Sequence, residues 1–175
     1  MRRTMLFLPG NNPNMMMNGG LLGADSIIFD LEDAVAPDQK DAARDLVKQA
    51  LTALDFGRCE RIIRINALDT PYWETDLEEM IPLRPAMIMP TKVSGAEYIR
   101  KLDQRMSEIE AANGLPVGEI RLIPLLETTL GIENAYGIAT ASPRMEALYL
   151  GAEDLTADLR CGRTKEGAEI AYARG

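Results

Sequence analysis

The sequence contains no histidine, and this absence excludes several kinds of site. Ser-His-Asp triads, zinc sites built on imidazole and a histidine general base all require that side chain. The two cysteines, Cys59 and Cys161, do not form a CxxC pair, and we interpret both as inert. A metal in this protein would therefore be a hard cation bound by oxygen atoms, such as magnesium.

Long apolar runs and an excess of positive charge are also missing. No run approaches the roughly 20 residues that a membrane helix requires, so no membrane association is expected. The 27 acidic residues outnumber the 19 basic ones, giving a net charge of −8, which argues against a nucleic-acid partner. With few cysteines and no N-terminal secretion pattern, we expect a cytoplasmic protein.

Short apolar runs alternate with helical patterns along the chain. We predict strands at residues 4–8, 26–31, 61–65, 86–89, 120–126 and 147–150. The predicted helices cover residues 13–22, 40–54, 76–81, 95–112, 132–141 and roughly 165–174. This alternation indicates an α/β fold, with a parallel sheet covered by helices.

Two parallel architectures fit this alternation, a doubly wound open sheet and a closed (β/α)8 barrel. No GxGxxG motif follows the first strand, which disfavours the dinucleotide-binding form of the open sheet. Polar side chains lie at or just after the carboxyl ends of most strands, as on the active face of a barrel: Asn11, Asn12, Asp30, Glu32, Arg64, Asn66, Lys92, Glu127 and Asp154. We predict a TIM (β/α)8-type barrel, forming a single incomplete domain over residues 1–175 and truncated after about six βα units.

Two of these acids, Glu127 and Asp154, follow consecutive predicted strands. Consecutive parallel strands end at the same edge of a sheet, so the two carboxylates are expected to be neighbours. Magnesium usually takes one or two carboxylates and completes its coordination with water and substrate oxygens. The pair is therefore a candidate magnesium site. For either acid alone, capping of the following helix is an equally good explanation.

Arg64 is the charged exception in a predicted strand of isoleucines, and burying it without a partner would be costly. We expect it to face an anion, either a substrate oxygen or a protein carboxylate. Asp30 and Glu32, two residues apart, share one face of their strand. They could support metal-bound water, form an ion pair with Arg64, or simply begin a turn before Pro37.

Together these motifs resemble the citrate lyase beta-subunit branch of the HpcH/HpaI aldolase superfamily. The matching segments follow the family's order over nearly the whole chain: RRTMLFLPGN (2–11), FDLEDAV (29–35), RINALD (64–69), LETTLGI (126–132) and LGAED (150–154). Four further residues extend the likeness to that branch: Arg160, Arg163, Glu166 and Gly167.

The resemblance implies a modified TIM barrel that uses Mg2+ to cleave a carbon–carbon bond in a hydroxyacyl thioester. It implies that Glu127 and Asp154 are the magnesium ligands and that Arg64 is the catalytic cation, in contact with the substrate. It further implies substrate contacts from Glu127 and from the backbone around Ala152 and Glu153.

The implied reaction splits a citryl thioester of an acyl carrier protein or coenzyme A into oxaloacetate and an acetyl thioester. Citrate lyase complex subunits and a homo-oligomer are the implied partners. Citramalyl-CoA or malyl-CoA lyase and pyruvate aldolase are alternatives within this chemistry. The chain departs from the family by inserting Thr91 before Lys92 and by lacking the last two βα units. A truncated, non-catalytic member that binds an acyl carrier or an assembly partner is therefore a further alternative.

Overall fold

The computed structural model describes residues 2–175. All paired strands are parallel, and five of them form one sheet in the order β1-β2-β3-β4-β5, while β6 pairs with β7. The strands are β1 (Met5–Pro9), β2 (Ser26–Asp30), β3 (Glu60–Ile65), β4 (Met87–Pro90), β5 (Arg121–Leu122), β6 (Leu125–Leu126) and β7 (Tyr149–Leu150).

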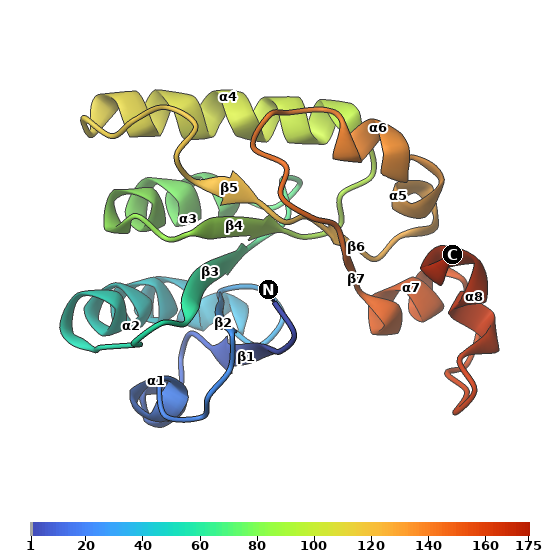
Figure 1. Ribbon diagram of the computed structural model, residues 1–175, viewed down its shortest axis with the longest axis horizontal. Coiled ribbons are helices and arrows are strands. Elements are labelled where there is room, and N and C mark those ends of the chain that lie inside the picture. The colour runs from blue at the N-terminus through green and yellow to red at the C-terminus, as the bar shows by residue number, and fades with distance from the viewer. Residues whose placement is uncertain (1) are drawn as a thin grey trace.

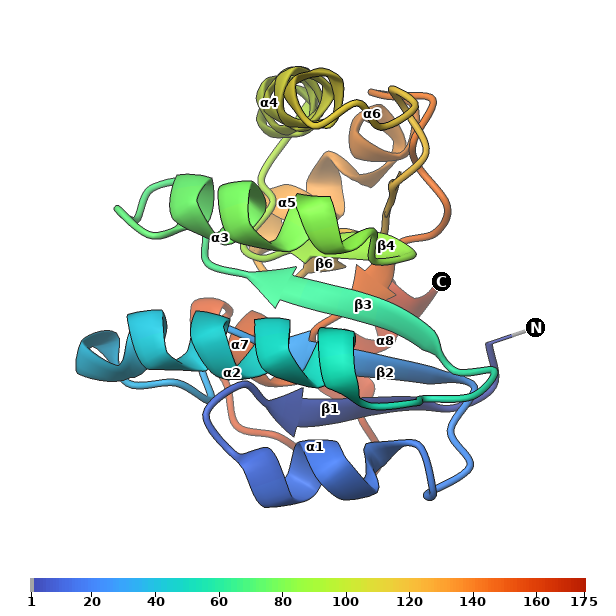
Figure 2. The same ribbon diagram turned by 90° about the vertical axis from the view of Figure 1, so that its left-hand side faces the viewer.

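The strand order decides between the two parallel architectures. Each strand of the main sheet pairs with the next one in the chain, with no reversal of order. A doubly wound sheet has such a reversal at its switch point, whereas a barrel does not. The helices α1 to α4 accordingly cover one side of a curved sheet (Figures 1 and 2). The prediction of an α/β fold of the barrel type is confirmed.

The predicted strand at residues 120–126 is divided into β5 and β6. Pro124 lies between them and has no N–H group to donate to a neighbouring strand. Backbone hydrogen bonds nevertheless continue on both sides of the break. The N–H of Ile123 donates to the carbonyl of Ile88 at 3.1 Å, and that of Tyr149 donates to Pro124 at 2.9 Å. The β6–β7 pair therefore extends the curve of the main sheet (Figure 1).

The helices follow most of the predicted patterns, and none is long and apolar enough to cross a membrane in the part of the chain described. They are α1 (Pro13–Gly19), α2 (Lys40–Ala53), α3 (Trp73–Met80), α4 (Ala96–Ala112), α5 (Thr129–Glu133), α6 (Ala135–Ala139), α7 (Ala152–Asp158) and α8 (Ala171–Arg174), with 3-10 turns at Pro37–Gln39, Ile81–Leu83 and Ala168–Ile170. Helix α7 was not predicted, and it places Asp154 in a first helical turn.

Buried side chains form two cores, one beneath the helices and one on the inner face of the curved sheet. On β2, Ile27 and Phe29 belong to the core beneath the helices, while Ile28 belongs to the core on the inner face. Side chains alternate along a strand, so Asp30 shares the inner face with Ile28. The inner core contains six fully buried residues: Ile28, Ile62, Met87, Met89, Ile123 and Leu125. Polar groups at the carboxyl end of this face thus lie next to a layer of buried apolar side chains.

Candidate active site

Arg64 and Asp30 form a two-point ion pair at the carboxyl ends of β3 and β2. The strand register sets them opposite each other, with Nε 2.7 Å from Oδ1 and Nη2 2.5 Å from Oδ2. Nη1 lies 3.4 Å from Glu32 Oε2, and the guanidinium stacks over the Phe7 ring. From the sequence we expect Arg64 to face either a substrate oxygen or a protein carboxylate. In the structure it faces the carboxylates of Asp30 and Glu32.

Lys92 connects Glu32 to Glu127. Its Nζ lies 3.0 Å from Glu32 Oε1, and its backbone N–H donates to Glu127 Oε1 at 2.8 Å. The φ angle of Lys92 is 53°, a left-handed value that few residues other than glycine adopt. Burial lowers the pKa of Lys92, but the contact with Glu32 outweighs this and leaves the pKa raised. The sequence assigned no role to Lys92, although it follows a strand like the other polar groups of the site.

Glu127 lies directly after β6, with only 2% of its surface exposed. Burial raises the pKa of Glu127 to about 7, and the neighbouring Asp154 carboxyl adds to this shift, while the hydrogen bond from Lys92 opposes it. Two carboxylates that share a buried space disfavour each other's charged form, and a cation between them removes that penalty. The pair predicted from sequence is therefore brought together, with Asp154 presented by α7 rather than by a strand.

Gly151 permits this close approach of α7 to Glu127. A Cβ atom at position 151 would lie 2.8 Å from the Cβ of Glu127 and 3.0 Å from its Oε2. The φ of Gly151 is −92°, so any residue could adopt its backbone conformation and only space requires glycine. The next residue, Ala152, begins α7, and the exposed Glu153 side chain pairs with Arg163 at 3.1 Å.

The donor set fits magnesium better than other metals. Within residues 2–175, no three or more Cys, Asp or Glu side chains gather as a metal cluster. Zinc commonly needs three or four protein ligands and calcium six to eight oxygens, whereas magnesium is satisfied by one or two carboxylates plus water and substrate. Glu127 and Asp154 supply such a pair. Asp30 and Glu32 lie nearby but are engaged by Arg64 and Lys92.

A buried polar layer supports the turn that carries Glu32. Lys40 Nζ donates to the carbonyls of Leu31 and Glu32, both at 2.7 Å, and Asn66 Nδ2 donates to Leu31 at 3.0 Å. Asp76 from α3 accepts a second bond from Asn66 at 2.7 Å. These roles were not predicted from the sequence. One signal was available, because Lys40 precedes Ala43 and Val47 at helical spacing and so lies on the apolar face of α2.

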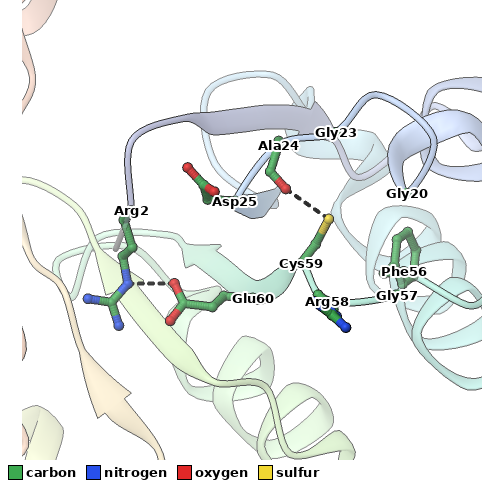
Figure 3. Close-up of a pocket in the computed structure, with 10 residues that line it drawn as sticks. All are labelled: Arg2, Gly20, Gly23, Ala24, Asp25, Phe56, Gly57, Arg58, Cys59 and Glu60. Carbon is green, nitrogen blue, oxygen red and sulfur yellow. Dashed lines mark hydrogen bonds and ion pairs between the residues drawn. The ribbon is translucent and has the colours of Figure 1, made fainter.

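A cavity of about 480 Å3 lies at the opposite, amino end of the strands (Figure 3). Its lining includes Arg2, Cys59 and Glu60, all of which have partners. Arg2 Nε lies 2.5 Å from Glu60 Oε2, and the Cys59 thiol donates to the carbonyl of Ala24 at 3.0 Å. Active sites of parallel barrels lie at the carboxyl ends of the strands, and residues at the amino end serve stability. We therefore place the candidate site at the carboxyl ends of the strands, around Glu127 and Asp154.

The fold and this site define an α/β protein of the barrel type with a candidate cation site where its strands end. The family model described as HpcH/HpaI aldolase/citrate lyase matches residues 3–175, and the chain belongs to this family. The resemblance of the sequence motifs to the family is thereby confirmed.

Several relatives and solved structures are similar to this chain. The citrate lyase subunit beta of Leuconostoc mesenteroides subsp. cremoris is 44% identical over 99% of this chain and 58% of its own length. The L-malyl-CoA/beta-methylmalyl-CoA lyase of Rhodobacter capsulatus is 38% identical over 95% of this chain and 53% of its own length. The chain thus spans just over half the length of these curated relatives.

Solved structures agree with the fold. RipC from Yersinia pestis superimposes with a TM-score of 0.77 at 27% identity, covering 99% of this chain and 68% of that one. The citrate lyase beta subunit of M. tuberculosis, complexed with oxaloacetate and magnesium, gives a TM-score of 0.76 at 31% identity, covering 99% of this chain and 72% of that one.

Proposed function

We propose that the protein acts as a magnesium-dependent carbon–carbon lyase on a citryl thioester, releasing oxaloacetate and an acetyl thioester. The observation that carries this proposal is the meeting of the Glu127 and Asp154 carboxyls next to a network that contains Arg64 and Lys92. Similarity to proteins named citrate lyase subunit beta, and to one solved with oxaloacetate and magnesium, supports the choice of substrate.

Glu127 and Asp154 are the residues that would hold the metal. When bound, magnesium supplies a positive charge that grips substrate oxygens and stabilises negative charge as it develops on them. The raised pKa of the buried Glu127 supports this assignment, because a nearby cation would relieve the cost of keeping it ionised.

Arg64 and Lys92 supply fixed positive charge beside the metal pair. Asp30 holds one edge of the Arg64 guanidinium by two hydrogen bonds, so the guanidinium needs little rearrangement to stabilise an oxyanion at the carboxyl ends of the strands. The Lys92 side chain is 45% exposed. It is therefore accessible to a substrate carboxylate, and its raised pKa keeps it cationic.

The start of α7 supplies the remaining substrate contacts in this proposal. The N–H groups of Ala152 and Glu153 belong to the first helical turn, where backbone donors have no intrahelical acceptor. They would donate to the carboxylate of the keto acid. Cleavage transfers one proton overall, from the hydroxyl group to the carbon of the departing acetyl thioester.

The partners follow from the same proposal. We propose that the acyl group arrives on an acyl carrier protein or coenzyme A, and that other citrate lyase subunits and further copies of this chain are the assembly partners. Similarity to a lyase named for malyl-CoA and methylmalyl-CoA makes malyl thioesters the second candidate substrate.

A direct assay tests the proposal. The protein is incubated with magnesium and citryl-CoA, citryl-loaded carrier protein or malyl-CoA, and the keto acid released is measured by coupled reduction. We expect oxaloacetate to be released from a citryl thioester. A chelator should abolish this release, and so should the substitution Asp154→Asn. Glyoxylate from malyl-CoA alone would favour the second candidate. Magnesium binding without turnover of any thioester would contradict the lyase proposal and favour a non-catalytic binding role.

A further inference from the structure

Asp158 ties the helix that carries Asp154 to the segment that carries Glu127. It is the last residue of α7, one helical turn after Asp154. Thr129 is the first residue of α5, two residues after Glu127. A single oxygen, Oδ2 of Asp158, accepts both the backbone N–H and the hydroxyl of Thr129, each at 2.7 Å.

We propose that Asp158 is a positioning residue that sets the relative placement of the Glu127 and Asp154 carboxylates. This role rests on the proposed magnesium-dependent function. Glu127 lies directly after β6 and Asp154 lies in α7, and β6 pairs with β7 at only two register positions. A contact beyond the strand ends is therefore needed to fix the direction of α7 relative to Glu127.

Thr129 is a suitable anchor because the segment that follows it is closely packed. The preceding Thr128 caps α5, with its Oγ1 accepting the N–H of Gly131 at 3.1 Å. Gly131 packs so tightly that a Cβ there would lie 2.3 Å from the carbonyl oxygen of Val93. Val93 in turn follows Lys92, whose N–H holds Glu127. Asp158 thus attaches α7 to the same closely packed segment that fixes Glu127.

On α7, Leu155 and Asp158 have different roles. Leu155 is 1% exposed, so its burial holds one side of the helix in place, but burial of one apolar side chain does not by itself set the direction in which Asp154 points. Asp158, one turn from Asp154, constrains that direction by its two hydrogen bonds. Loss of the Asp158 bonds should therefore shift Asp154 without unfolding the protein.

Geometry and charge must be separated in the test, because Asp158 is itself an anion near a cation site. Asparagine keeps a carbonyl oxygen with two lone pairs and can accept both bonds without carrying charge. Alanine removes both the bonds and the charge. If position matters, Asp158→Asn behaves like the wild-type protein and Asp158→Ala does not.

The experiment is calorimetric titration of the full chain with magnesium chloride. We expect Asp158→Ala to weaken magnesium affinity about tenfold, the lower end of the effect of losing a partner that orients a metal ligand. We expect Asp158→Asn to stay within about twofold, since an exposed charge is screened by solvent and salt. Asp45→Ala, at another exposed helical aspartate, should leave affinity unchanged. Amide exchange at Thr129 should accelerate in the alanine variant only.

The results distinguish failure of the positioning role from failure of the proposed function. Unchanged magnesium affinity in Asp158→Ala, with magnesium binding in the wild type, overturns the positioning role and leaves the proposed function standing. Equal weakening in Asp158→Asn and Asp158→Ala overturns it as well, because charge alone then explains the effect. A wild-type chain that binds no magnesium overturns the proposed function and the positioning role with it.

Discussion

Asp30 and Arg64 stand opposite each other on neighbouring parallel strands, and two hydrogen bonds of 2.7 and 2.5 Å join them. The strand register alone brings them together, so the pair is built into the sheet rather than into a flexible loop. The Arg64 guanidinium also lies 3.4 Å from the Glu32 carboxylate. Arg64 therefore compensates the buried Asp30 and, together with Lys92, the buried Glu32.

Arg64→Met should destabilise the protein by about 3–5 kcal/mol at neutral pH, because removing one partner leaves buried carboxylates uncompensated. Urea unfolding measures the change. Arg84→Met is the control, since Arg84 and Glu119 form an exposed pair whose loss should cost less than about 1 kcal/mol. Equal losses in the two variants would show that the Asp30–Arg64 pair behaves as a surface ion pair.

Gly151→Ala should disturb the candidate metal site by steric overlap. The added Cβ would meet Glu127 at 2.8 Å, and relieving such overpacking typically costs about 1–3 kcal/mol. We expect lower thermal stability and weaker magnesium binding. At Gly137 in α6 a Cβ meets nothing within 4 Å, so Gly137→Ala should leave both unchanged or slightly raise stability. Normal magnesium affinity in Gly151→Ala would show that Glu127 does not need this space.

Lys40→Met should lower the free energy of unfolding by about 2–3 kcal/mol, because the carbonyls of Leu31 and Glu32 lose a charged donor inside the protein. Lys48, exposed on the same helix, gives the matched control. We expect Lys48→Met to remain within about 0.5 kcal/mol of the wild type. If both variants unfold at the same urea concentration, the turn after β2 does not depend on Lys40.

Tyr98 should ionise at a higher pH than an ordinary tyrosine. Burial raises the pKa of Tyr98 above its usual value of about 10, and its hydroxyl donates to Thr91 and accepts from the N–H of Leu68. Its stabilising contribution is thus fully present below about pH 10 and is lost as pH rises through the raised pKa. The difference in alkaline absorbance between the wild type and Tyr98→Phe isolates the ionisation of Tyr98, and we expect it above about pH 10. Ionisation of Tyr98 at or below about pH 10 would contradict its buried environment.

The sequence predicted those features that depend on local pattern. Arg64 was recognisable because a charge interrupts a run of isoleucines, and Asp30 was placed on the inner face by strand alternation. The parallel sheet followed from the alternation of strands and helices. These inferences succeed because side-chain direction on a strand has a fixed period of two.

Contacts between distant segments could not be predicted in this way. Lys40 reaches the turn after β2 only because α2 packs across it, and Asp158 meets Thr129 only because β6 and β7 lie side by side. The predicted strand at residues 120–126 overlooked the break at Pro124. Helix α7 was missed because its seven residues are too few to show a periodic pattern.

Calorimetric titration of single variants with magnesium shows whether Glu127 and Asp154 together bind the metal. Glu127→Gln and Asp154→Asn keep the shape of each side chain while removing its charge, and Glu133→Gln, at an exposed acid on α5, serves as the control. We expect at least about a tenfold loss of magnesium affinity in each of the first two variants and none in the control. Wild-type affinity in either Glu127→Gln or Asp154→Asn would contradict this expectation.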